Sequence, residues 1–104
     1  MWRLTLLVFT LTITLLAEDW PEWRGKGRTG VWNETGVLET FPKNGLKVEW
    51  RVPIHTGFGG PAVSGGRIYV TDFSASSRLK GRERVLCLDE KTGKIIWSQE
   101  WDAD

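Results

Sequence analysis

The chain opens with a long apolar run that ends abruptly at acidic residues. After a short basic start at Arg3, every residue from Leu4 to Ala17 is apolar or threonine, and Glu18 and Asp19 follow directly. A membrane-spanning helix needs about 20 apolar residues, so this run is short for an uncleaved membrane anchor, which is the alternative interpretation. A basic start, an apolar stretch and a small final residue form the pattern of a secretory signal. We predict a signal peptide at residues 1–17, no membrane span after its cleavage, and a periplasmic or extracellular protein.

From residue 47 onward the pattern changes to the two-residue period of strands. Val48, Trp50 and Val52 alternate with polar neighbours, and Pro53 follows. This alternation predicts a strand over residues 47–52 with one apolar and one solvated face. Because an outer strand is covered less than an inner one, we expect this segment to be an extra outer strand.

Four further strands are predicted, and together they make the chain all-β. Apolar or alternating stretches bounded by turn residues lie at 61–64, 67–73, 84–88 and 94–101. The pair Gly65 and Gly66 predicts a two-residue hairpin turn, because glycine takes a positive φ at no steric cost. A polar loop is expected at 74–82. We therefore predict a four-stranded antiparallel sheet preceded by the extra strand.

Composition narrows the class of protein. The 104 residues include seven Trp, twelve Gly and one Cys, and the formal net charge is +1. The charge balance gives no basis for a nucleic-acid partner, and a single Cys excludes an intrachain disulfide framework. Residues 18–46 are rich in Trp, Gly and Pro without a period, so we expect an extended lead-in that packs through its aromatic rings. The domain order is thus 1–17, 18–46 and 47–104.

A short internal repeat predicts that this sheet is a single blade of a truncated β-propeller. Lys47-Val48-x-Trp50 recurs 47 residues later as Lys94-Ile95-x-Trp97. A repeat of about 40–50 residues with four strands is typical of propeller blades. A blade needs neighbours to cover its two faces, so we expect this chain to be part of a propeller several times longer.

The same region resembles the pyrroloquinoline-quinone-binding-like (quinoprotein alcohol dehydrogenase-like) β-propeller repeat. The matching residues are Gly60-Pro61-Ala62-Val63-x-Gly65-Gly66-Arg67-Ile68-Tyr69-Val70-x-Asp72 and Val85-Leu86-x-Leu88-Asp89-x-x-Thr92-Gly93-Lys94-x-x-Trp97. The opening Trp20-Pro21-x-Trp23-Arg24-Gly25 is also similar to the N-terminal segment of exported members. The resemblance implies that tryptophan docking fastens blade to blade, with Asp89, Thr92, Gly93 and Trp97 in that structural role and Trp50 as the first copy of the tryptophan.

The resemblance allows two functions. The first is a non-enzymatic scaffold that binds other proteins through blade surfaces and needs no cofactor. The alternative is the N-terminal part of a quinone-dependent dehydrogenase, with pyrroloquinoline quinone and calcium held by residues beyond Asp104. No catalytic, cofactor-binding or metal-binding constellation stands out in this chain, which favours the scaffold.

The other chemically suggestive residues have simpler explanations. The string Gly25-Lys26-Gly27-Arg28-Thr29-Gly30 lacks the preceding strand and following helix of a dinucleotide site, so we expect a solvated loop. His55 has no partner at ligand spacing, and Cys87 lies within an apolar strand. Asp72 and Asp89 are expected to cap strand ends. We expect a solvated basic patch from four residues, Arg78, Lys80, Arg82 and Arg84.

Overall fold

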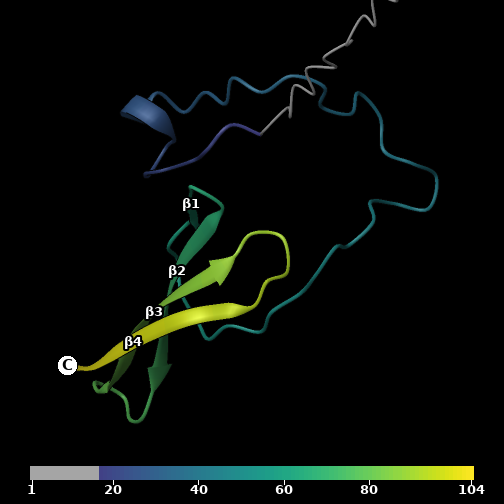
Figure 1. Ribbon diagram of the computed structural model, residues 1–104. Helices are drawn as coiled ribbons and strands as arrows, with labels where there is room; N and C mark the ends of the chain where they lie inside the picture. The colour runs from purple at the N-terminus through teal and green to yellow at the C-terminus, as the bar shows by residue number, and fades with distance from the viewer. Residues whose placement is uncertain (1–16) are drawn as a thin grey trace, which may run out of the picture.

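The computed structural model describes residues 17–104, and the expected signal segment lies outside the described residues except for Ala17. In this described part of the chain, one short 3-10 helix, η1 (Lys26–Arg28), precedes four strands. The strands are β1 (Ala62–Ser64), β2 (Arg67–Ala75), β3 (Gly81–Asp89) and β4 (Ile95–Ala103). They form one open antiparallel sheet in the order β1-β2-β3-β4 (Figure 1). The all-β, four-stranded antiparallel prediction is confirmed.

The turns follow from the residues that the sequence places there. Gly65 and Gly66 join β1 to β2 with φ angles of 58° and 76°, the positive values that a two-residue hairpin turn requires. The connection between β2 and β3 is shorter than expected, because Ser74 and Ala75 still pair with Arg82 and Gly81. The expected loop over 74–82 therefore reduces to residues 76–80.

The expected extra strand at 47–52 is absent, and this prediction is wrong. Residues 47–55 form no ladder with any other part of residues 17–104, and only Thr56 makes an isolated bridge, to Phe73. Alternation of apolar and polar residues produces a strand only where a neighbouring strand offers free backbone groups. Here β1 pairs only with residues 67–69 of β2, and the chain reaches the free side of β2 first at Thr56, so residues 47–55 lie beside the sheet and are held mainly by side chains.

The two faces of the sheet differ in what covers them. Register places Ile68, Val70, Asp72, Arg84, Leu86 and Leu88 on one side, which we call the Trp50 face. There Val70, Leu86 and Leu88 form the buried cluster, and Trp50 packs against it. The opposite side, the Trp97 face, consists of Tyr69, Thr71, Phe73, Glu83, Val85, Cys87, Trp97, Gln99 and Trp101.

The lead-in at 18–46 attaches to the sheet through one tryptophan. Trp20 and Val63 exchange two backbone hydrogen bonds of 2.9 and 2.8 Å, which extends the sheet at β1 by one bridge. The Trp20 ring also covers Gly25, where an added Cβ would lie 2.6 Å from the ring. After η1 the chain runs as a long loop outside the sheet before it returns near β2 (Figure 1). In the lead-in, Trp20 therefore packs through its ring as expected, whereas Trp23 and Trp32 are exposed.

Candidate functional site

The turn between β3 and β4 is built by a carboxylate that binds three donors. Asp89 Oδ1 accepts hydrogen bonds from the backbone N–H groups of Lys91 and Thr92 and from the Thr92 hydroxyl, at 3.0, 2.9 and 3.0 Å. The Thr92 N–H, and then its hydroxyl, hold the pKa of Asp89 below its ordinary value. Gly93 closes the turn with a φ of 70° and donates its N–H to the Asp89 carbonyl oxygen at 2.8 Å. These contacts make residues 89–93 a compact platform, which we call the Gly93 turn.

Trp50 docks on the Gly93 turn. Its indole N–H donates to the carbonyl oxygen of Glu90 at 2.8 Å. A Cβ at Gly93 would lie 2.5 Å from Cε3 of the Trp50 ring, so the flat ring rests directly on glycine backbone. An aromatic ring with one polar atom gains both apolar burial and a hydrogen bond at such a place. The contact spans 40 residues of sequence and ties the segment before the sheet to its far turn.

Trp97 is the second copy of this tryptophan in the repeat, and within residues 17–104 it docks on no turn. It projects from β4 on the Trp97 face, and its ring centroid is 6.2 Å from that of Tyr69. The residue is 41% exposed. Within residues 17–104 its indole N–H donates no hydrogen bond, unlike that of Trp50. The repeat thus contains one docked and one undocked tryptophan.

A buried ion pair between β2 and β3 lies on the Trp50 face of the sheet. Asp72 on β2 and Arg84 on β3 are directly opposite in register and bind through two hydrogen bonds of 3.0 and 2.6 Å. The Asp72 side chain is fully buried, and its second oxygen also accepts the His55 N–H at 2.7 Å. The bond from Arg84 is the main cause that lowers the pKa of Asp72 to about 2, and the same bond raises the pKa of Arg84. This pair fastens the chain before β1 to the middle of the sheet.

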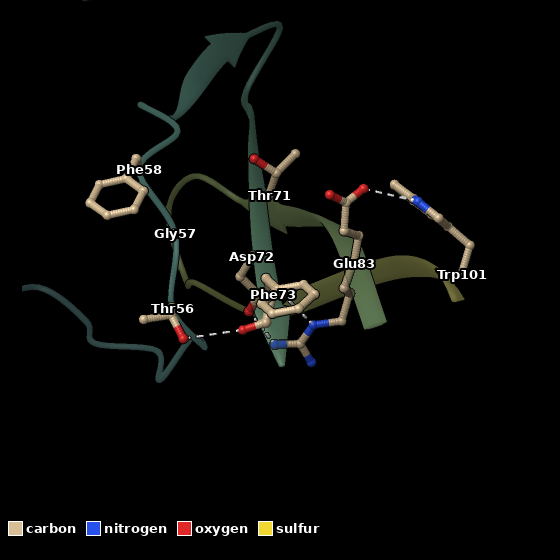
Figure 2. A pocket seen from close by; sticks show the side chains of 9 residues that line it. Thr56, Gly57, Phe58, Thr71, Asp72, Phe73, Glu83 and Trp101 are labelled. Carbon is tan, nitrogen blue, oxygen red and sulfur yellow. Dashed lines mark hydrogen bonds and ion pairs between the residues drawn. The ribbon is translucent and has the colours of Figure 1, made fainter. Parts of the chain in front are cut away.

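A groove of about 300 Å³ lies between residues 56–58 on one wall and β2, β3 and Trp101 of β4 on the other (Figure 2). The Trp101 indole N–H donates to the Glu83 carboxylate at 3.0 Å, and the Thr56 hydroxyl donates to the Phe73 carbonyl oxygen at 3.3 Å. Phe58, on the wall of residues 56–58, is fully exposed. Asp72 also borders the groove, but a carboxylate with a pKa of about 2 is too weak a base for proton transfer near neutral pH.

Two expectations about charged residues are wrong. Asp72 caps no strand end, because it lies within β2 and is paired with Arg84. The expected solvated basic patch is divided, since Arg84 is bound to Asp72 and Arg82 reaches the β4 acids Glu100 and Asp102. Once β2 and β3 are read as one hairpin and β3 and β4 as the next, opposite charges across each hairpin are the signal that could have revealed both contacts.

The other residues that could have indicated chemistry, Cys87, His55 and the glycine-rich string, make contacts that explain them without a functional role. Cys87 is buried without a disulfide partner. His55 is a loop residue with Nδ1 3.9 Å from Asp72 Oδ2. Part of the glycine-rich string forms η1, and its Gly27 and Arg28 bind the Glu22 carboxylate, at 3.0 Å in each case. The Gly27 N–H and the Arg28 side chain are therefore already bound to an acid of this chain, and they do not form a free site for an anion.

Among residues 17–104, no cluster of three or more potential metal-ligating side chains is present. In the same part of the chain, no helix is long and apolar enough to cross a membrane. Comparison with known protein families, with curated proteins and with solved structures finds no match.

Proposed function

We propose that the chain is an exported β-propeller repeat protein that acts as a binding or assembly scaffold for other proteins, with blades fastened by tryptophan docking. The observation that carries the proposal is the contact between Trp50 and the Gly93 turn. It is a contact between a tryptophan and the turn of the following four-stranded unit, which is the arrangement that the quinoprotein-like resemblance implies between blades. On this proposal the sheet is one blade, and residues 47–55 take the position of the last strand of a preceding blade without forming a strand.

The Trp97 face supports the binding role. Trp97 and Trp101 are 41% and 45% exposed there, and Tyr69, Phe73 and Val85 are only partly buried. Contiguous exposed aromatic surface on a sheet is typical of a protein contact. The polar groups on this face are few, and one of them, Glu83, is already bound by Trp101. A partner that covers this face buries mostly apolar area, and Glu83 is the one acid that it also covers.

A photo-crosslinking experiment tests the proposed scaffold. Benzoyl-phenylalanine is placed at Gln99 on the Trp97 face, or at Ser98 on the same strand but the opposite face as a matched control. The full chain is expressed in a bacterial host and irradiated in intact cells. We expect a protein-sized covalent product from position 99 and several-fold less from position 98. Equal labelling at the two positions, or none at either, would contradict a binding role for the Trp97 face.

A further inference from the structure

Glu18, the first residue after the expected signal segment, is held by three groups that lie 14–16 residues further along the chain. Its backbone N–H donates to the Glu34 carboxylate at 2.5 Å. Its side chain accepts the Asn33 N–H at 2.6 Å, and its carbonyl oxygen accepts the Trp32 indole N–H at 3.4 Å. The first residues of a domain are usually poorly ordered unless contacts tie them down. Here the nitrogen, the carbonyl and the side chain of one residue are all tied to residues 32–34.

The surroundings of the Glu18 nitrogen are acidic. Residues 17–23 and 29–42 contain no lysine or arginine but five acids, Glu18, Asp19, Glu22, Glu34 and Glu39. The cavity beside Glu18 is bordered by one more acid, Glu90. Among residues 17–104, no basic side chain forms an ion pair with Glu18 or Glu34. A positive charge on the Glu18 nitrogen would therefore meet a carboxylate that has no other cationic partner in this part of the chain.

Hydrolysis of the peptide bond between Ala17 and Glu18 places such a charge on that nitrogen. Ala17 is the small residue that the cut of a signal peptidase follows, at the end of the expected signal segment. One water is consumed. Its oxygen joins the carbonyl carbon of Ala17 to leave a carboxylate, the C–N bond breaks, and both water protons end on the Glu18 nitrogen. An α-amino group has an ordinary pKa of about 7.7–8.0, so it is mostly an ammonium group at neutral pH.

We propose that a signal peptidase cuts between Ala17 and Glu18 and that the new α-ammonium group of Glu18 pairs with the Glu34 carboxylate. This inference rests on the export in the proposed function. The N–H that Glu34 accepts in the uncut chain is neutral, whereas the ammonium group carries a full positive charge. Hydrogen bonds between charged groups are about twice as strong as those between neutral groups. The cut therefore strengthens the contact that holds the start of the lead-in against residues 32–34.

Export of the full chain from a bacterial host, followed by intact mass measurement, tests the cut, and we expect a protein that begins at Glu18. Acylation of the α-amino group at neutral pH, followed by mass spectrometry of the N-terminal peptide, tests the pair, because only the unprotonated amine reacts. The wild type is expected to react about 2- to 5-fold more slowly than Glu34→Gln, the range for an exposed ion pair. Glu39→Gln removes the same charge from an exposed residue of the same segment, and it is expected to match the wild type.

A second measurement does not depend on how the variants fold. If Glu34→Gln loses its β-sheet circular dichroism, a synthetic peptide of residues 18–24 supplies the rate of the unpaired amine, and the wild type is expected to react more slowly by a similar factor.

The outcomes separate this inference from the proposed export. A mature protein that begins at another residue, a Glu18 that has lost water by cyclising, or equal acylation rates with and without the Glu34 charge would overturn the inference and leave the export in place. An uncut chain found outside the cytoplasm also rejects the inference alone. A chain that stays in the cytoplasm with residues 1–17 rejects the inference together with the export.

Discussion

Replacement of Gly93 by alanine is expected to expel Trp50 from the Gly93 turn. The new Cβ would lie 2.5 Å from the Trp50 ring, on a residue whose φ is 70°. The left-handed conformation costs an alanine about 1–2 kcal/mol, and overpacking adds about 1–3 kcal/mol. The strained backbone costs the same with Trp50 docked or undocked, so only the overpacking acts on the docking equilibrium, and a loss of up to about 3 kcal/mol corresponds to a factor of up to about 100. Because the ring can move more easily than the turn, the Trp50 contact gives way first.

Indole hydrogen exchange of 15N-tryptophan-labelled protein measures this effect. In the wild type the Trp50 indole is bound to the Glu90 carbonyl oxygen and is expected to exchange more slowly than the exposed Trp23 indole. In Gly93→Ala the two rates are expected to become similar. The matched control is Gly36→Ala, where φ is 72° but nothing lies within 4 Å of the added Cβ. Slow exchange of Trp50 in Gly93→Ala, or fast exchange in Gly36→Ala, would contradict the docking geometry.

Loss of the Asp72 carboxylate is expected to disorder the hairpin of β2 and β3 at neutral pH. Removal of one member of a buried ion pair costs about 3 kcal/mol, because the other charge is left without its partner. Arg84 is 22% exposed, so water compensates it only in part. His55 also loses the acceptor for its backbone N–H. In a sheet with so few buried side chains, Asp72→Ala is expected to lose most of its β-sheet circular dichroism at pH 7.

The same carboxylate sets the acid stability of the sheet. Arg84 lowers the pKa of Asp72 from 3.8 to about 2, so folding favours the ionised form. The contribution is therefore fully present above about pH 4 and is lost as the pH falls through about 2. Asp72→Asn keeps the shape and one acceptor but does not titrate. Its circular dichroism is expected to be weaker at pH 7 and nearly constant from pH 4 to 2. A wild-type signal that already disappears above pH 5 would contradict this assignment.

The local pattern of the sequence predicted the sheet well because its causes are local. Gly65 and Gly66 have the φ angles that a tight hairpin needs, and the apolar run at 84–88 lies within β3 as expected. The turn at Asp89 and Gly93 also follows from residues within five positions of each other. Such features depend on backbone geometry and near neighbours, which the order of residues specifies directly.

Long-range features were predicted poorly for a physical reason. The alternation at Val48, Trp50 and Val52 specifies one apolar face but not whether a strand with free backbone groups lies beside it. The Asp72 and Arg84 pair depends on the register of β2 against β3, which the loop length fixes. The expected loop at 74–82 and the observed loop at 76–80 share the same centre, so both place Asp72 opposite Arg84, and the pair could have been predicted from the expected hairpin. The contact between Trp50 and Gly93 joins residues that only the folded chain brings together.

The most direct test of the central claim, that the sheet is one unit of a stack with a face that requires a partner, is thermal unfolding of monomeric residues 18–104. Among residues 17–104, only Val70, Leu86, Cys87 and Leu88 form the buried apolar core, while Trp97 and Trp101 remain half exposed. We expect a broad transition in which near-ultraviolet circular dichroism is lost well below the far-ultraviolet signal. A single sharp transition of the monomer, coincident in both signals and with equal calorimetric and van't Hoff enthalpies, would contradict the claim.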